Sequence, residues 1–125
     1  PRGHGETLLL VEDEATVLNM AVEALEFLGY TVFAAPAPGA ALHLAAAHAG
    51  TIDLLITDIV MPEMNGRELA ERVAAIQPGI KRLYVSGYPA DFVALRGVLG
   101  EGVNFLQKPF SLQGLAVKVR EVLAD

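Results

Sequence analysis

Two patterns of apolar residues alternate along the chain, one with the length of β-strands and one with the spacing of helices. Leu8 to Val11 and Leu54 to Ile56 are uninterrupted apolar runs, as expected for strands buried on both faces of a parallel sheet. Other segments repeat apolar residues three and four positions apart, which is typical of amphipathic helices. The predicted strands cover residues 7–11, 30–35, 52–58, 80–86 and 103–107. The predicted helices cover residues 15–28, 38–49, 66–77, 90–99 and 112–124.

Glycine, proline and serine residues mark several of the predicted ends. Gly29 follows the first helix, where glycine commonly ends a helix. Pro38 suits the first turn of the second helix, and Ser111 has the side chain of a good N-cap for the last one. The segment 90–99 is the weakest helix, and we expect Gly97 to break it and Gly100 to end it.

Strand and helix alternate five times, which predicts an α/β fold with a parallel sheet, helices on both faces and right-handed crossovers. All carboxyl ends of such strands lie at one edge of the sheet, where ligands bind. Polar residues that end or follow four of the strands are therefore expected to meet: Glu12 and Asp13, Asp58, Ser86, and Lys108. The second strand contributes no polar residue, which fits a place at the side of the sheet.

The charges of this group predict its chemistry. Three neighbouring carboxylates, on Glu12, Asp13 and Asp58, repel one another when all are ionised, so either their pKa values rise or a cation joins them. Oxygen ligands without nearby His or Cys favour Mg²⁺ or Mn²⁺. A divalent cation together with Lys108 would offset the three negative charges. The pattern therefore predicts phosphoryl transfer, in which Asp58 attacks phosphorus while Lys108 and Ser86 stabilise the equatorial oxygens.

Composition narrows the class of protein. The chain has 125 residues, 53% of them hydrophobic, which is enough for one domain with a buried core. No run approaches the roughly 18 apolar residues of a membrane helix and no signal peptide opens the chain, so we expect a cytoplasmic domain without membrane contact. There is no cysteine, which excludes disulfides and thiolate metal sites. A net charge of -6 with nine scattered Lys and Arg argues against direct nucleic-acid binding.

The first residues differ from the rest. Residues 1–6 are short, Gly-rich and lack an initiator Met. We expect them to be a linker or an engineered remnant, with the domain at 7–125 and with further sequence in the parent protein.

The residues at the strand ends resemble those of the receiver domains of bacterial response regulators. The motifs are, in chain order, Glu12-Asp13, Asp58-Ile59-Val60-Met61-Pro62-Glu63-Met64-Asn65-Gly66, Ser86-Gly87 and Lys108-Pro109-Phe110. Each motif alone is common, whereas their joint order is specific, and the resemblance extends from about Thr7 to Ala124. It implies a flavodoxin-like three-layer sandwich with a five-stranded parallel sheet in the order 2-1-3-4-5.

The resemblance also implies a role for each site residue. Asp58 corresponds to the phosphoacceptor of the family. Asp13 and Asp58 would bind Mg²⁺ together with the backbone carbonyl of Val60, and Glu12 would act through metal-bound water. Lys108 would pair with the phosphoryl group, and the peptide bond after it would be cis.

Ser86 and Phe105 match the switch pair of the family. The hydroxyl would turn to the phosphoryl group and the ring would turn inward, which changes the face formed by the fourth helix, fifth strand and fifth helix. The implied partner is a histidine kinase or histidine phosphotransfer domain of a two-component system or phosphorelay, and a phosphorylation-dependent homodimer is left open. Such a domain catalyses only its own phosphorylation and dephosphorylation.

The kind of parent protein that contains this domain is open to two interpretations. Ser86-Gly87-Tyr88-Pro89 and residues 102–110 resemble receivers at the C-terminus of hybrid sensor histidine kinases, and a stand-alone receiver or one from a DNA-binding regulator is the alternative.

Two residues near the site bear on the lifetime of the phosphoryl group. Val60 lies two residues past the acceptor Asp58, and Tyr88 lies two residues past the switch hydroxyl of Ser86. Neither positions water well, which predicts slow self-dephosphorylation.

Three other classes of function share parts of this pattern. A phosphatase of the haloacid dehalogenase type would have a second Asp where this chain has Val60. A flavin-binding protein would need a phosphate loop after the first strand, where Glu12, Asp13 and Glu14 would repel phosphate. An interaction module that is not phosphorylated would normally lack one of the site residues. Each feature alone also has a purely structural explanation. The acidic run of Glu12, Asp13 and Glu14 is typical of a helix start. Ser86 alone would be a turn residue, Lys108 a solvated surface charge, and Phe105 part of the core.

Overall fold

Five strands alternate with five helices in the residues that the structure, a computed structural model, describes, which are 2–100 and 102–125. The strands are β1 (Thr7–Val11), β2 (Thr31–Ala35), β3 (Leu54–Asp58), β4 (Lys81–Ser86) and β5 (Phe105–Gln107). The helices are α1 (Ala15–Phe27), α2 (Pro38–Ala47), α3 (Gly66–Ile76), α4 (Pro89–Leu99) and α5 (Leu112–Ala124). All strand pairs are parallel, in the order β2-β1-β3-β4-β5, which confirms the expected α/β fold and strand order.

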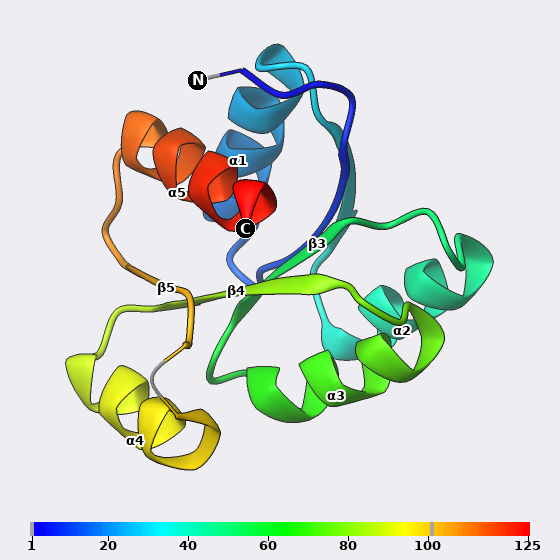
Figure 1. The fold of residues 1–125 in the computed structure, drawn as a ribbon. Coiled ribbons are helices and arrows are strands. Elements are labelled where there is room, and N and C mark those ends of the chain that lie inside the picture. The colour runs from blue at the N-terminus through cyan, green and yellow to red at the C-terminus, as the bar shows by residue number, and fades with distance from the viewer. Residues whose placement is uncertain (1, 101) are drawn as a thin grey trace.

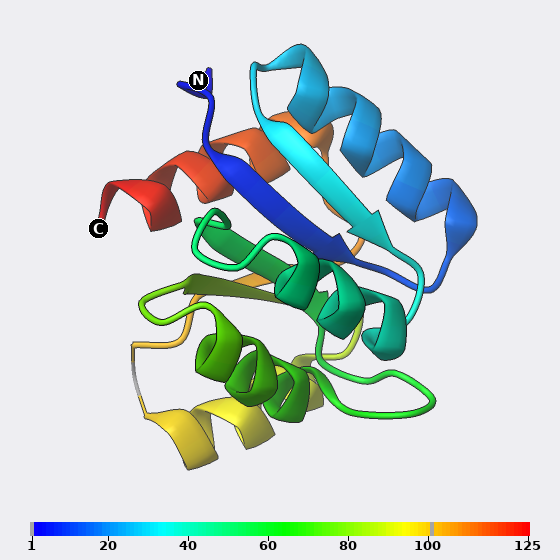
Figure 2. The same ribbon diagram turned by 90° about the vertical axis from the view of Figure 1, so that its right-hand side faces the viewer.

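The helices lie on both faces of the sheet (Figures 1 and 2). Helices α1 and α5 pack over one face, and α2, α3 and α4 pack over the other. Along β1 the side chains alternate between the two layers, with Leu8 and Leu10 facing α1 and α5 while Leu9 faces α2 and α3. This two-sided burial explains why the central strands are continuous apolar runs. In the described part of the chain, no helix has the length and apolar character needed to cross a membrane.

The expected break of the fourth helix at Gly97 is wrong, and several predicted ends differ from the observed ones by one or two residues, such as the end of α2 at Ala47 and the start of β3 at Leu54. Helix α4 continues through Gly97 and ends at Leu99, followed by Gly100 with φ of 91°. A glycine within a helix costs about 1 kcal/mol, which is too little to break a helix held to the core by the buried Leu95. Strand β5 is shorter than predicted, because residues 103 and 104 precede it as a connection whose Asn104 carbonyl still accepts the Tyr84 N–H at 2.9 Å.

The segment before β1 contacts the domain. Of the predicted linker, residue 1 lies outside the described residues. The Gly3 N–H donates to the Leu28 carbonyl at 2.7 Å, and Glu6 forms an ion pair with Arg120 at 2.7 Å. That ion pair, through the Arg120 hydrogen bond first of all, lowers the pKa of Glu6 from 4.5 to about 2.

A buried amide joins the loops at the amino-terminal edge of the sheet. Gln77 is 2% exposed and follows α3. Its oxygen accepts the N–H groups of Gly50 at 2.9 Å and Ile52 at 3.4 Å, and its nitrogen donates to the carbonyls of Ala45 at 2.9 Å and His48 at 2.8 Å. Every hydrogen-bonding position of the amide is thus used, which fixes the connection between α2 and β3.

At the opposite edge, α3 begins very close to the end of β3. The Gly66 N–H donates to the Ile59 carbonyl at 2.6 Å. A Cβ atom at Gly66 would lie 2.2 Å from the carbonyl oxygen of Asp58, so this position accepts no side chain without movement of the backbone. Gly39 in α2 differs, since a Cβ atom there would have no neighbour within 4 Å.

The two glycines predict opposite effects of the same substitution. Gly66→Ala should lower the free energy of unfolding by more than about 2 kcal/mol, because backbone must shift to relieve the clash. Gly39→Ala should raise it by about 0.5–1 kcal/mol through helix propensity. Urea denaturation of the two variants tests this, and equal changes in stability would contradict the close approach at Gly66.

Candidate functional site

The candidate site lies at the carboxyl edge of the sheet, where Asp58 is the last residue of β3. The strand is buried along its whole length, and Asp58 itself is only 6% exposed. It pairs in register with Val85 of β4, so the next residue of β4, Ser86, lies at the same edge. The loop after β1 brings Glu12 and Asp13 to this edge from the other side.

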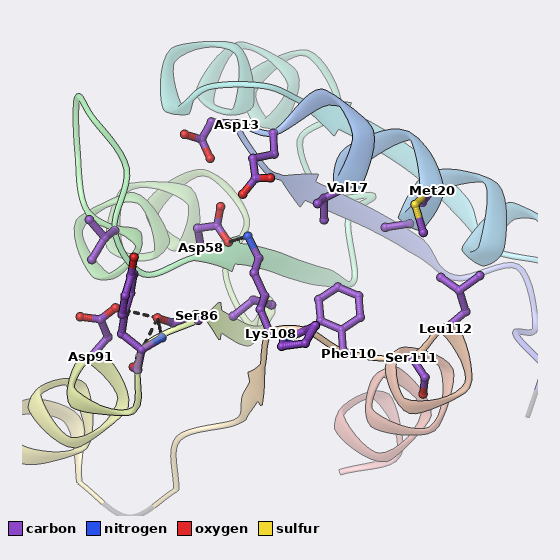
Figure 3. Close-up of a pocket in the computed structure, with 17 residues that line it drawn as sticks. Asp13, Val17, Met20, Asp58, Ser86, Asp91, Lys108, Phe110, Ser111 and Leu112 are labelled. Carbon is purple, nitrogen blue, oxygen red and sulfur yellow. Dashed lines mark hydrogen bonds and ion pairs between the residues drawn. The ribbon is translucent and has the colours of Figure 1, made fainter.

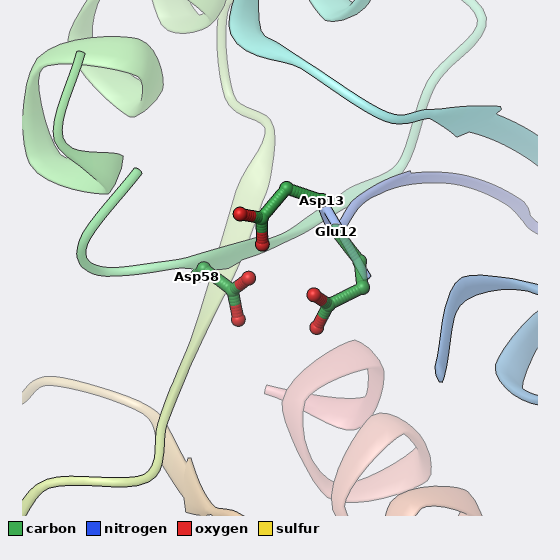
Figure 4. A group of neighbouring side chains, drawn as sticks. All are labelled: Glu12, Asp13 and Asp58. Carbon is green, nitrogen blue, oxygen red and sulfur yellow. The ribbon is translucent and has the colours of Figure 1, made fainter. Parts of the chain in front are cut away.

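Three carboxylates gather there (Figure 4). One oxygen each of Glu12, Asp13 and Asp58 lies within 4.8 Å of the other two. Glu12 is buried at 4% exposure and Asp13 is exposed, so the group opens to solvent on the side of Asp13. An all-oxygen donor set with one open side fits a hard divalent cation such as Mg²⁺, which binds few protein ligands and keeps waters.

Lys108 supplies the positive charge of the group. Its Nζ lies 2.5 Å from Oε1 of Glu12 and 3.0 Å from Oδ1 of Asp58. Its backbone N–H donates to the Ser86 carbonyl at 2.9 Å, and the Lys108–Pro109 peptide bond is cis. The lysine thus contacts two carboxylates directly, and the contact with Glu12 was not foreseen from the sequence.

Burial and charge set the protonation of the acceptor candidate. Burial raises the pKa of Asp58 to about 7, and the neighbouring Glu12 charge adds to the rise, although the hydrogen bond from Lys108 opposes both. Burial would lower the pKa of Lys108, but its hydrogen bonds to Glu12 and Asp58 outweigh that effect and raise it. A cation among the carboxylates would favour the ionised form of Asp58, which is its nucleophilic form.

Ser86 is at the site, but its hydroxyl is engaged elsewhere. The hydroxyl donates to Oδ2 of Asp91 at 2.6 Å and accepts the Tyr88 N–H at 3.0 Å. Asp91 lies in the first turn of α4, and sequence reasoning missed it. The available signal was an acidic residue shortly after Pro89, which is common at a helix start and therefore indicates no specific partner.

Phe105 does not line the site. It opens β5 beside Tyr84 of β4, and its ring stacks on Phe92 of α4 with the ring centres 4.6 Å apart. Phe105 is partly buried against the core layer of α2, α3 and α4.

The site residues face a cavity of about 840 Å³ (Figure 3). Polar residues that line it include Asp13, Asp58, Ser86, Asp91 and Lys108. Apolar side chains of α1, of the connection before α5 and of the first residue of α5 form the opposite wall: Val17, Met20, Phe110 and Leu112. Two exposed side chains also line it, Val60 at 64% and Tyr88 at 72% exposure.

The histidines lie outside this arrangement. Among the described residues, the acidic group of Glu12, Asp13 and Asp58 is the only set of carboxylate, histidine or cysteine side chains placed to hold a metal ion. His48 instead stacks on Phe33 with ring centres 4.1 Å apart.

A family model, described as the response regulator receiver domain, matches residues 8–120. The chain is 42% identical over 117 residues to the sensor kinase CckA of Brucella abortus, and this match covers 94% of the chain and 12% of that protein. It is 34% identical over 116 residues to the response regulator receiver protein CpdR of the same organism, covering 93% of the chain and 95% of CpdR.

Solved structures give the same result. A receiver domain from the hybrid histidine kinase CckA matches with a TM-score of 0.79 at 34% identity, covering 94% of this chain and 98% of that one. A receiver domain protein from Methanospirillum hungatei matches with a TM-score of 0.81 at 30% identity, covering 96% and 94%. The chain thus spans about an eighth of the sensor kinase and nearly all of a single-domain relative.

The raised pKa of Asp58 predicts a pH-dependent stability. A carboxyl group whose pKa rises on folding from 3.8 to about 7 destabilises the fold increasingly as pH rises through that window. In the presence of a chelator, Asp58→Asn should therefore be more stable than the wild type at pH values above about 7, by about 1–2 kcal/mol, and the difference should shrink towards pH 4.

Asp53→Asn is the matched control, because Asp53 lies before the same strand, is exposed, and accepts the Thr7 N–H at 2.8 Å. Chemical denaturation at several pH values measures both variants. If Asp53→Asn raises the free energy of unfolding as much as Asp58→Asn does, or if Asp58→Asn does not raise it, then the ionised Asp58 does not destabilise the fold as predicted.

Proposed function

We propose a phosphoryl-accepting role for Asp58, on the premise that the chain belongs to the response regulator receiver domain family, as the match over residues 8–120 and the 34% identity to CpdR show. As a member of that family, the chain is a receiver domain of two-component signalling. The observation that carries the residue assignment is the position of Lys108, whose ammonium contacts Asp58 at 3.0 Å inside a group of three carboxylates.

The proposed reaction uses the side chains as they lie. A carboxylate oxygen of Asp58 attacks the phosphorus of a phosphohistidine, the phosphorus–nitrogen bond breaks, and the imidazole leaves. Lys108, already beside Asp58, offsets negative charge on the transferred group. Asp13, Asp58 and the backbone carbonyl of Val60 would hold Mg²⁺, with Glu12 acting through water. When bound, the ion supplies charge neutralisation on the phosphoryl oxygens.

The phosphodonor is a histidine kinase or a histidine phosphotransfer domain. The 42% identity to the sensor kinase CckA supports a place in a hybrid kinase. The alternative, a stand-alone receiver, is supported by CpdR, of which the chain covers 95%. A phosphatase of the haloacid dehalogenase type is not favoured, because Val60 stands where such an enzyme needs a second carboxylate and because the family match is to receivers.

The proposed output uses the face formed by α4, β5 and α5. Ser86 would turn its hydroxyl to the phosphoryl group, and Phe105 would leave its stack on Phe92 for an inward position. Because Phe105 has no hydroxyl, apolar burial alone would stabilise that position. The changed face would bind the downstream partner or a second copy of the chain. The functional unit in this proposal is residues 7–125.

Phosphorylation by a small donor tests the acceptor directly. With Mg²⁺ and acetyl phosphate, the protein should gain one base-labile phosphoryl group per chain, detected by intact mass spectrometry. Asp58→Asn should gain none, and Lys108→Ala should be labelled at least about tenfold more slowly. Asp53→Asn, with its carboxylate at the other end of β3, should label like the wild type. Label on Asp58→Asn, or labelling at an undiminished rate in chelator, contradicts the proposal.

The side chains at the mouth of the cavity predict a long-lived phosphoryl group. Val60 and Tyr88 line the cavity and offer no carboxylate or amide to hold an attacking water. Val60→Asn combined with Tyr88→Glu should increase the rate of phosphoryl loss, by at least about tenfold. The decay of pre-labelled protein after removal of the donor measures this rate, and an unchanged decay refutes the interpretation.

A further inference from the structure

The hydroxyl of Ser86 has one proton, and that proton is already committed. It is donated to the carboxylate of Asp91 at 2.6 Å, a length typical of a charge-assisted hydrogen bond (Figure 3). The oxygen also accepts the Tyr88 N–H at 3.0 Å, and the Tyr88 carbonyl, at 3.5 Å, is a more distant alternative acceptor for the proton. The hydroxyl therefore points towards the start of α4, and it cannot donate to Asp91 and to a phosphoryl oxygen at the same time.

We infer that Asp91 is a positioning residue that competes with the phosphorylated acceptor for the Ser86 hydroxyl. The inference rests on the proposed function, in which Ser86 binds a phosphoryl oxygen. In the resting arrangement the carboxylate of Asp91 holds the hydroxyl away from Asp58. In the phosphorylated arrangement the phosphoryl oxygens take the proton instead, and the bond to Asp91 is lost.

The place of Asp91 in the fold gives this competition a consequence for α4. Asp91 lies in the first turn of α4, and its N–H donates to the Tyr88 carbonyl at 3.0 Å. The bond from Ser86 therefore ties the end of β4 to the start of α4 across the loop of Gly87 and Tyr88. When Ser86 changes partner, this tie is broken, which couples the chemistry at Asp58 to the position of the helix on the output face.

The surroundings of the Asp91 carboxylate support this positioning role. It is partly buried, lines the same cavity as Asp58 and Lys108, and lies beside a serine that is only 6% exposed. A carboxylate that served only the helix dipole could remain in solvent. Glu68, the acidic residue in the first turn of α3, keeps 46% of its side chain exposed and pairs with Arg72 at 2.9 Å.

A double-mutant cycle tests the competition. The probe is beryllium fluoride with Mg²⁺, which mimics a phosphoryl group on a carboxylate, and binding is followed by NMR. Asp91→Ala should bind the probe about three- to tenfold more tightly than the wild type, because the competing acceptor is gone. In a Ser86→Ala background the same substitution should change the affinity no further. Glu68→Ala, which removes the same charge from another helix start, should bind like the wild type.

A second measurement needs no probe. In the absence of Mg²⁺ and beryllium fluoride, Asp91→Ala should shift the amide resonance of Tyr88, whose acceptor is the Ser86 oxygen, and Glu68→Ala should leave it in place. If Asp91→Ala does not fold, Asp91→Asn serves instead. It keeps the shape but removes the charge, so it should give a smaller gain of about twofold.

The outcomes separate the two proposals. An Asp91→Ala variant with wild-type affinity, or with the same gain whether or not Ser86 is present, overturns the competition while leaving the acceptor role of Asp58 intact. A wild-type protein that shows no saturable binding of the probe overturns both. A gain that requires Ser86, together with the shift at Tyr88, supports the competition.

Discussion

The contact of one ammonium group with two buried carboxylates is the interaction on which the site depends. Lys108 follows the last strand, whereas Glu12 follows β1 and Asp58 ends β3. Their charges can be close only because the strands are parallel and end at one edge. The same geometry makes the ionised form of Asp58 unfavourable, because burial raises the pKa of this carboxyl group. Lys108 opposes that rise, and a bound cation would do the same. The fold therefore places a carboxylate that is unfavourable to ionise at the position of the proposed nucleophile.

Two-sided packing of the sheet maintains this arrangement. The layers of α1 and α5 and of α2, α3 and α4 bury β3 along its whole length, which holds the end of this strand in place. Gly66 adds a second constraint, because it lets α3 begin in contact with the backbone of Asp58. The acceptor is thus fixed by backbone packing, while the groups around it, Ser86 and Phe105, are held by side-chain contacts that can be exchanged.

Much of this could be predicted from the sequence, for physical reasons that also explain the failures. The strands and helices have strong periodicity, and parallel pairing brings Asp58 and Lys108 to one edge whatever the details of the loops. The continuity of α4 through Gly97 was missed because tertiary packing of Leu95 outweighs a local propensity. The bond between Ser86 and Asp91 was missed because it depends on the loop and on the rotamer of a short side chain. The functional roles of the site residues remain predictions, since proximity alone does not establish chemistry.

The fully paired amide of Gln77 has a consequence for how the domain tolerates change. It secures the edge of the sheet opposite the site, where α2 and α3 meet the start of β3. Substitutions there should reduce the yield of folded protein without altering the chemistry of what does fold, whereas substitutions around Ser86 should do the reverse. Inherited variation in this domain can therefore act on abundance and on signalling through separate parts of the molecule.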